Sequence, residues 1–322
     1  MAVAGRRRAL RRAALLLAAS LLGGCAALDA PQSRALSAAP PSTLRGAVEL
    51  TRVPFFAQAQ FHCGPASLAM VAQAAGVDVT PEALADGVFL PAREGALQVE
   101  MLAAARRQGL LAVPLPRRLD ALLAELDAGH PVVVLQNLAL PIAPRWHYAV
   151  AVGYDLAAGE IVLRSGDQPR QRMTLSTFEH TWARGGHWAF VALPPPALPA
   201  TADEADAVQA ALGFERVAAP ADAARAWAGV RARWPDHLVA AIGHGNALFA
   251  AGDADAAARV LAHAAQRHDS AAAWNNLARV HLQRGDRDAA IAAARRAVAA
   301  AQREPTWRDA AAQTLRRVEQ AP

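Results

Sequence analysis

Residues 58–69 have the sequence Gln-Ala-Gln-Phe-His-Cys-Gly-Pro-Ala-Ser-Leu-Ala, in which Cys63 directly precedes an apolar segment that opens with Pro65. Proline is favoured in the first turn of a helix, so we expect a helix over residues 65–75 with Cys63 at its N-terminus. The unpaired N–H groups and the helix dipole at such a terminus are expected to lower the pKa of a thiol. The stretch therefore predicts a cysteine nucleophile.

Two further features supply partners for this thiol. Gln58 and Gln60 lie just upstream, and a glutamine amide can donate a hydrogen bond to an oxyanion beside the backbone N–H of Cys63. Gln58 and its competitor Gln60 are both candidates for this role. The alternating stretch at residues 146–154 predicts a strand that carries His147.

These segments resemble the bacteriocin-processing (double-glycine leader) type of papain-like cysteine peptidase. The resemblance rests on the pattern Gln-x(4)-Cys-Gly-Pro-Ala-Ser-Leu-Ala and on the stretch Trp-His-Tyr-Ala-Val-Ala-Val-Gly-Tyr at residues 146–154, and it covers roughly residues 50–195. It implies a papain-like fold, with Cys63 as nucleophile, His147 as base and Gln58 in the oxyanion hole. It implies peptide or protein substrates and no cofactor.

The third member of the catalytic triad departs from the family pattern. The family usually carries Asp-Pro on the strand after the histidine, whereas residues 163–167 here have the sequence Leu-Arg-Ser-Gly-Asp. Asp167 is the preferred orienting residue. Ser165 is an alternative that would hold the imidazole more weakly, and Asp155 is disfavoured because it opens the turn that follows the histidine strand.

The expected fold of residues 47–195 is α+β, with helices first and an antiparallel sheet after them. Helices are predicted at residues 65–75, 81–87, 97–109 and 119–127. Strands are predicted at residues 132–135, 146–154, 160–164 and 188–193.

The rest of the chain is predicted to be helical. Three prolines from Pro194 onward end the sheet and begin a linker at residues 196–201. In residues 202–322, Gly252-Asp253 within an alanine-rich segment recurs as Gly285-Asp286, 33 residues later. This spacing resembles that of tetratricopeptide repeats, with about three units and a capping helix near residues 307–318. Such repeats imply a protein partner.

The N-terminus has the features of an export signal. Residues 1–24 combine five arginines with a short apolar run, and Leu22-Gly23-Gly24-Cys25 resembles the bacterial lipobox. Lipid on Cys25 would anchor the chain, and Ala26 after it is typical of outer-membrane lipoproteins of Gram-negative bacteria. Residues 25–46 are expected to be a flexible tether. We therefore expect a peptidase that faces the periplasm.

The composition argues against other classes of function. Residues 1–24 hold five of the 33 basic residues and no acidic one, so the remainder carries 28 basic and 28 acidic residues, which does not favour nucleic-acid binding. Two cysteines exclude a disulfide framework, and scattered histidines do not predict a metal site. The alternatives to a peptidase are a catalytically degenerate adaptor, or an amidase or transpeptidase acting on cell-wall peptides.

Overall fold

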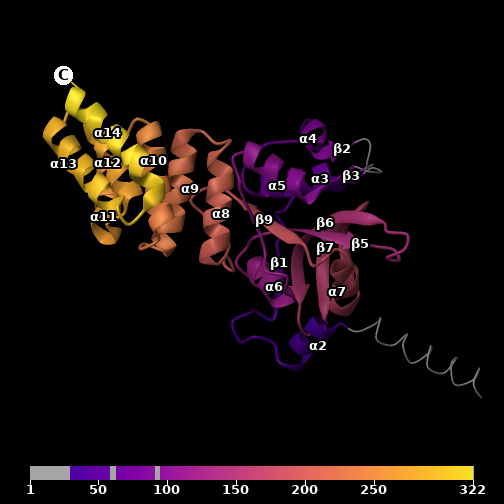
Figure 1. Ribbon diagram of the computed structural model, residues 1–322. Coiled ribbons are helices and arrows are strands. Elements are labelled where there is room, and N and C mark those ends of the chain that lie inside the picture. Colours follow the sequence, from indigo (N-terminus) through magenta and orange to yellow (C-terminus); the bar gives the residue numbers. More distant parts are fainter. Residues whose placement is uncertain (1–29, 59–62, 91–94, 322) are drawn as a thin grey trace, which may run out of the picture.

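The computed structural model describes residues 30–58, 63–90 and 95–321 (Figure 1). Its N-terminal part is built on an antiparallel sheet in the order β4-β9-β5-β6-β7-β8, and a further strand, β1, pairs with β6. The sheet strands are β1 (Ala47–Glu49), β4 (Leu111–Pro114), β5 (Val132–Asn137), β6 (Trp146–Asp155), β7 (Glu160–Ser165), β8 (Gln168–Thr174) and β9 (Ala189–Leu193). The predicted α+β class is confirmed.

Helices cover both faces of this sheet, because alternate side chains of each strand enter two separate apolar cores. Val133, Tyr148 and Val150 pack on one face against α3 (Cys63–Ala74), α4 (Pro81–Val88) and α5 (Gln98–Arg107). Val132 and Val134 pack on the other face against α6 (Leu119–Asp127) and α7 (Leu175–Arg184). A short hairpin of β2 (Phe89–Leu90) and β3 (Gly95–Ala96) lies between α4 and α5.

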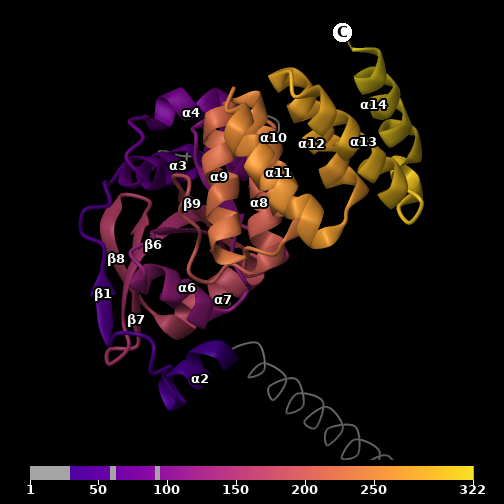
Figure 2. The same ribbon diagram turned by 90° about the vertical axis from the view of Figure 1, so that its left-hand side faces the viewer.

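One segment differs from the expectation of a flexible tether. Residues 31–38 form the helix α2 (Pro31–Ala38), which packs against α6 and α7 (Figure 2). The Glu179 carboxylate accepts hydrogen bonds from the backbone N–H groups of Gln32 and Ser33 at 3.0 and 2.6 Å, and Leu36 is buried. This carboxylate pairs with N–H groups that have no partner within the first turn of a helix. Tertiary contacts therefore stabilise a helix that the local sequence alone does not predict.

The C-terminal part is a stack of antiparallel helices. Its elements are α8 (Glu204–Glu215), α9 (Pro220–Arg233), α10 (Leu238–Ala250), α11 (Ala254–His268), α12 (Ala271–Arg284), α13 (Arg287–Ala300), η2 (Pro305–Trp307) and α14 (Arg308–Gln320). Gly285 ends α12 in the left-handed conformation with a φ of +79°, which suits glycine. A Cβ atom at Gly243 would lie 2.4 Å from the Trp227 ring, so the small residue allows α9 and α10 to pack closely. The helical-repeat prediction is confirmed.

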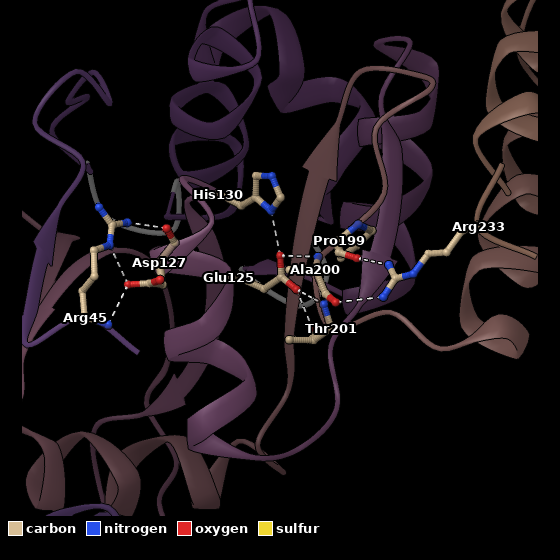
Figure 3. A network of polar contacts seen from close by, with 8 residues as sticks. All are labelled: Arg45, Glu125, Asp127, His130, Pro199, Ala200, Thr201 and Arg233. Carbon is tan, nitrogen blue, oxygen red and sulfur yellow. Dashed lines mark hydrogen bonds and ion pairs between the residues drawn. The ribbon is translucent and has the colours of Figure 1, made fainter. Parts of the chain in front are cut away.

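The helical stack is joined to the sheet by a shared core. Phe214 of α8 and Ala226 of α9 belong to the same apolar cluster as the strand residues of the sheet. Figure 3 shows a polar counterpart, in which Glu125 of α6 accepts hydrogen bonds from the linker residues Ala200 and Thr201. The predicted linker at residues 196–201 is therefore held in place by both parts.

Candidate active site

Cys63 is the first residue of α3, which packs against β6. Its thiol is half-buried and lies beside the backbone N–H groups of Gly64 and Tyr148 and its own. Tyr148 directly follows His147 in β6, so the structure brings the predicted nucleophile to the strand that carries the predicted base.

The pKa of Cys63 shifts in the direction opposite to the expectation for a helix N-terminus. Burial raises the pKa of the Cys63 thiol above its ordinary value of 9.0, and the three backbone N–H groups offset this only in part. The expected lowering is therefore wrong for the free protein, because desolvation of the thiolate outweighs the favourable dipoles. At neutral pH the thiol is protonated.

His147 is held by a hydroxyl. Its Nε2 lies 2.9 Å from the Oγ of Ser165 at the end of β7. Burial, with a smaller contribution from the Arg145 guanidinium, lowers the pKa of His147 to about 4. The imidazole is therefore neutral at pH 7 and can accept a proton. The ring nitrogen that Ser165 does not contact, Nδ1, forms no hydrogen bond with any residue that the structure describes.

The structure corrects the preferred third member of the triad. Asp167 lies exposed in the turn between β7 and β8 and does not contact the His147 ring, whereas Ser165 occupies that place. Asp155, as expected, turns away and accepts a hydrogen bond from the backbone N–H of Ala158 at 2.9 Å. Within residues 30–58, 63–90 and 95–321, the His147 ring is therefore held by the Ser165 hydroxyl, and no carboxylate contacts it.

Gln58 ties three segments together. Its side-chain Nε2 donates to the Oγ of Ser67 at 3.1 Å and to the carbonyl oxygen of Tyr148 at 3.2 Å, and its Oε1 accepts from the backbone N–H of Gly166 at 2.8 Å. Both amide hydrogens are therefore used inside the fold. Gln58 lies at the site as predicted, but its amide is not aimed at an oxyanion, which leaves the backbone N–H of Cys63 as a donor. Gln60 lies outside the described residues.

Sequence reasoning missed the part played by Tyr148. Its backbone N–H faces the thiol, its carbonyl binds Gln58, and its hydroxyl donates to the carbonyl of Ala96 at 3.2 Å. The ring also makes an edge contact with Trp188, with 5.9 Å between ring centroids. Side chains alternate along β6, so Tyr148 lies on the face opposite His147. This alternation was the sequence signal that could have identified Tyr148 as a residue facing α3.

Two classes of feature are missing from the residues that the structure describes. No group of three or more His, Cys, Asp or Glu side chains in residues 30–58, 63–90 and 95–321 is placed to hold a metal ion. Within the same ranges, no helix combines the length and the apolar character needed to cross a bilayer. Cys25 lies outside these ranges.

An antiparallel sheet packed against a helix that begins with cysteine, with histidine on one of its strands, is the arrangement that the resemblance to papain-like cysteine peptidases implies. Residues 50–189 match the protein family described as the Peptidase_C39 like family, and residues 248–314 match the tetratricopeptide repeat. The first part of the chain is therefore similar to C39-like peptidases, and the second part is similar to tetratricopeptide repeats.

One solved structure is also similar to part of this chain. The crystal structure of a putative C39-like peptidase from Bacillus anthracis is 22% identical, and the match covers 46% of this chain and 98% of that chain with a TM-score of 0.39. No curated protein matches the chain.

Proposed function

We propose that this protein is a lipid-anchored cysteine peptidase that hydrolyses peptide bonds of periplasmic peptides or proteins, with its repeats recruiting a partner. The observation that carries the proposal is the position of the Cys63 thiol at the backbone N–H of Tyr148 in β6, the residue that follows His147, whose neutral ring contacts Ser165. A neutral imidazole and a protonated thiol are the starting state for general-base activation of a nucleophile.

The proposed reaction proceeds in two halves. The sulfur of Cys63 attacks the peptide carbonyl while its proton moves to the free ring nitrogen of His147. The tetrahedral oxyanion receives a hydrogen bond from the backbone N–H of Cys63. It collapses to a thioester as His147 gives the proton to the leaving amine. Water then attacks the thioester, with His147 again as base, and releases the acid and the free thiol.

Cleavage of a peptide library by the full chain, read by mass spectrometry of the products, tests this proposal. We expect hydrolysed products from the wild-type chain and none from Cys63→Ala or His147→Ala. A matched control, His180→Ala, alters a histidine of α7 and should retain activity. Undiminished cleavage by Cys63→Ala would contradict the proposal. Products that carry a new amide bond would instead indicate a transpeptidase.

The alternative function is that of a catalytically degenerate adaptor. This alternative is favoured by Ser165, whose hydroxyl contacts His147 where the family usually has a carboxylate. The adaptor predicts a Cys63 that is inert to a peptide-based thiol-reactive probe, in a chain that still binds a partner through its repeats. The peptidase predicts labelling of Cys63 that disappears in His147→Ala.

The anchoring of the chain rests on the sequence of residues 22–25, and a separate experiment tests it. Bacteria that express the full chain are fed an alkyne-tagged fatty acid, and their membranes are fractionated. We expect label on the wild-type chain in the outer-membrane fraction and no label on Cys25→Ser. Label that persists in Cys25→Ser would contradict the assignment.

A further inference from the structure

The loop between β5 and β6 exposes an apolar surface that the proposed peptidase chemistry does not use. Residues 140–146, which we call the apolar loop, are all exposed, and their sequence, Leu-Pro-Ile-Ala-Pro-Arg-Trp, includes Arg145 and no acidic residue. Ile142 is 91% exposed, Leu140 64% and Trp146 54%, so the loop holds three of the six large apolar side chains that are exposed among the described residues. Apolar side chains gathered in this way mark an interaction surface.

Hydrogen bonds at its base hold the apolar loop in place. The side-chain oxygen of Asn137, a buried residue, accepts hydrogen bonds from the backbone N–H groups of Ala139 and Arg145 at 3.0 and 2.9 Å. The backbone N–H of Leu138 donates to the carbonyl of Arg145 at 2.9 Å. These bonds satisfy the buried amide oxygen and close the base of the loop. The exposed apolar side chains therefore belong to a built hairpin end that faces away from the sheet.

The helix α7 connects the base of the apolar loop to the start of α2 (Figure 1). At the last residue of α7, the Arg184 guanidinium donates to the carbonyl of Asn137 at 3.1 Å. Five residues earlier in the helix, the Glu179 carboxylate accepts from the N–H groups of Gln32 and Ser33. A helix rises about 1.5 Å per residue, so these two contact points are about 8 Å apart along α7. The start of α2 and the base of the loop are therefore neighbours in the fold.

The length of chain before α2 limits how far this surface can stand from a membrane. Cys25, the lipid acceptor of the proposed function, precedes Pro31, the first residue of α2, by six positions. Six residues span at most about 20 Å even when they are fully extended. A lipid on Cys25 would therefore keep α2, and the neighbouring apolar loop with it, close to the bilayer surface. This short reach favours the bilayer as the partner of the loop.

The composition of the apolar loop suits a bilayer interface. Tryptophan is enriched at the level of the lipid headgroups, because its ring is apolar and its N–H group is polar. The guanidinium of Arg145 is exposed and forms no hydrogen bond or ion pair with any residue that the structure describes. It can therefore pair with the phosphate of a lipid headgroup while the apolar side chains beside it enter the acyl region.

We propose that the apolar loop inserts Leu140, Ile142 and Trp146 into the interface of the bilayer, as a second membrane contact beside the lipid on Cys25. The inference rests on the lipid anchor of the proposed function, and it adds the orientation of the sheet domain on the membrane. Because His147 directly follows Trp146 in β6, this contact holds the histidine end of the strand at the membrane surface.

Quenching by spin-labelled lipids tests the proposal on the full chain, expressed in bacteria and purified from their membranes. The variant Cys63→Ala/Ile142→Cys carries one free thiol when lipid blocks the sulfur of Cys25, and this thiol is labelled with the fluorophore NBD. In vesicles of phosphatidylethanolamine and phosphatidylglycerol, we expect lipids with a doxyl group on the acyl chain to lower the NBD emission about twofold or more. The matched control, Cys63→Ala/Val217→Cys, places NBD at an exposed valine between α8 and α9, where the emission should not change.

Adding Leu140→Ser and Trp146→Ser to the chain labelled at position 142 should abolish most of the quenching, because serine gains nothing from entering the acyl region. Melting temperatures of all variants are compared so that a folding defect is not scored as lost insertion.

The outcomes separate this proposal from the proposed function. Equal quenching at positions 142 and 217, or none at position 142 of a chain that carries lipid, would overturn the loop contact and leave the anchor standing. A shift of NBD emission that depends on protein concentration without vesicles would assign the surface to a second copy of the chain and overturn the proposal. A chain recovered without lipid would overturn the anchor and the loop contact together. Peptide hydrolysis by the wild-type chain, measured separately, tests the peptidase by itself.

Discussion

At the scale of single residues, burial sets the charge state of the site, and Ser165 is the contact partner of the His147 ring. Its hydroxyl fixes the His147 ring at 2.9 Å, but it supplies no negative charge to stabilise an imidazolium. With the pKa of His147 lowered to about 4 and that of Cys63 raised by burial, both groups are neutral at pH 7. In the proposed reaction, proton transfer from thiol to imidazole would therefore accompany attack on the substrate and would not precede it.

A carboxylate at position 165 should change this balance. We expect Ser165→Asp to raise the pKa of His147 and to make alkylation of Cys63 by iodoacetamide at pH 7 about tenfold faster, because a negative partner favours the imidazolium–thiolate pair. Mass spectrometry of the Cys63 peptide measures the rate. Ser165→Asn has the same shape without the charge and should react like the wild type. Equal rates for the Asp and Asn variants would refute this electrostatic interpretation.

In the unaltered protein, the pH dependence of Cys63 reactivity reports whether the thiol and the imidazole are neutral or form an ion pair. Because the pKa of Cys63 is raised, we expect its alkylation rate to climb steadily from pH 6 to beyond pH 9, without a plateau at acid pH. His147→Ala should lower the alkylation rates, because the general base is lost, but it should leave the shape of the profile, without an acid plateau, in place. A plateau near pH 5 that vanishes in His147→Ala would instead reveal a preformed ion pair.

At the scale of elements, the start of α3 is pressed against the hairpin of β2 and β3. A Cβ atom at Gly64 would lie 2.7 Å from the Cβ of Ala96, a separation that requires one of the two segments to move. Gly64 therefore allows the helix that begins with the nucleophile to approach β3 closely.

Gly64→Ala should disturb stability and activity together. We expect a loss of about 1–3 kcal/mol in the free energy of unfolding, because an added methyl group overpacks this contact, and a large fall in peptide cleavage as Cys63 shifts. Urea denaturation and product analysis measure the two effects. Gly46→Ala is the control, since a Cβ atom there meets nothing within 4 Å. A Gly64→Ala chain as stable and active as the control would show that the contact is not required.

Many apolar elements of the peptidase domain followed from the sequence, whereas β1, β4, β8 and α7 were not predicted. The predicted helix at residues 119–127 coincides with α6, and the predicted strands differ from β5, β6, β7 and β9 by at most two residues at either end. The edge strand β8 was missed because it is largely exposed and polar, and it forms ion pairs through Arg170 and Arg172 with Glu49 and Glu160. Such a strand has no buried face to mark it.

The register of the sheet explains why the third site residue was misplaced. Extending the pairing of Val150 with Arg164 along regular strands would set Asp167 opposite His147. The chain instead leaves β7 after Ser165, and Gly166 turns it with a φ of +60°. The end of a strand depends on this turn and on its contacts with Gln58, which the local sequence does not encode.

At the scale of the whole molecule, Glu125 links the sheet domain to the helical stack. Its side chain is fully buried and accepts hydrogen bonds from His130, from the Ala200 backbone and from both donors of Thr201 (Figure 3). Burial by itself would raise the pKa of Glu125, but these bonds together lower it. Arg233 of α9 in turn donates to the carbonyl of Ala200, so the linker is held from both sides.

Loss of this charge should loosen the connection between the two parts. We expect Glu125→Gln to lower the free energy of unfolding at pH 7 by about 2–4 kcal/mol, because an NH2 group replaces one of the two oxygens that accept from buried donors. Because the pKa of Glu125 is lowered on folding, its contribution is complete above pH 4.5, the ordinary value, and declines as the pH falls further. The difference between wild type and variant should therefore narrow in acid.

Denaturation curves at several pH values measure this difference. The exposed Glu319 provides the control, and Glu319→Gln should change stability by less than about 1 kcal/mol. A gap between wild type and Glu125→Gln that widens below pH 4.5 would contradict the assignment of the lowered pKa.

The packing of Phe214 and Ala226 into the core of the sheet has a consequence for the choice of cleavage point. A partner segment bound by the helical stack would therefore reach the Cys63 sulfur from a fixed direction and at a fixed distance. Only bonds at a set spacing from the gripped segment would come within reach. A change in that spacing would require a different interface between the sheet domain and the helical stack, because a longer loop alone would not move the two parts relative to each other.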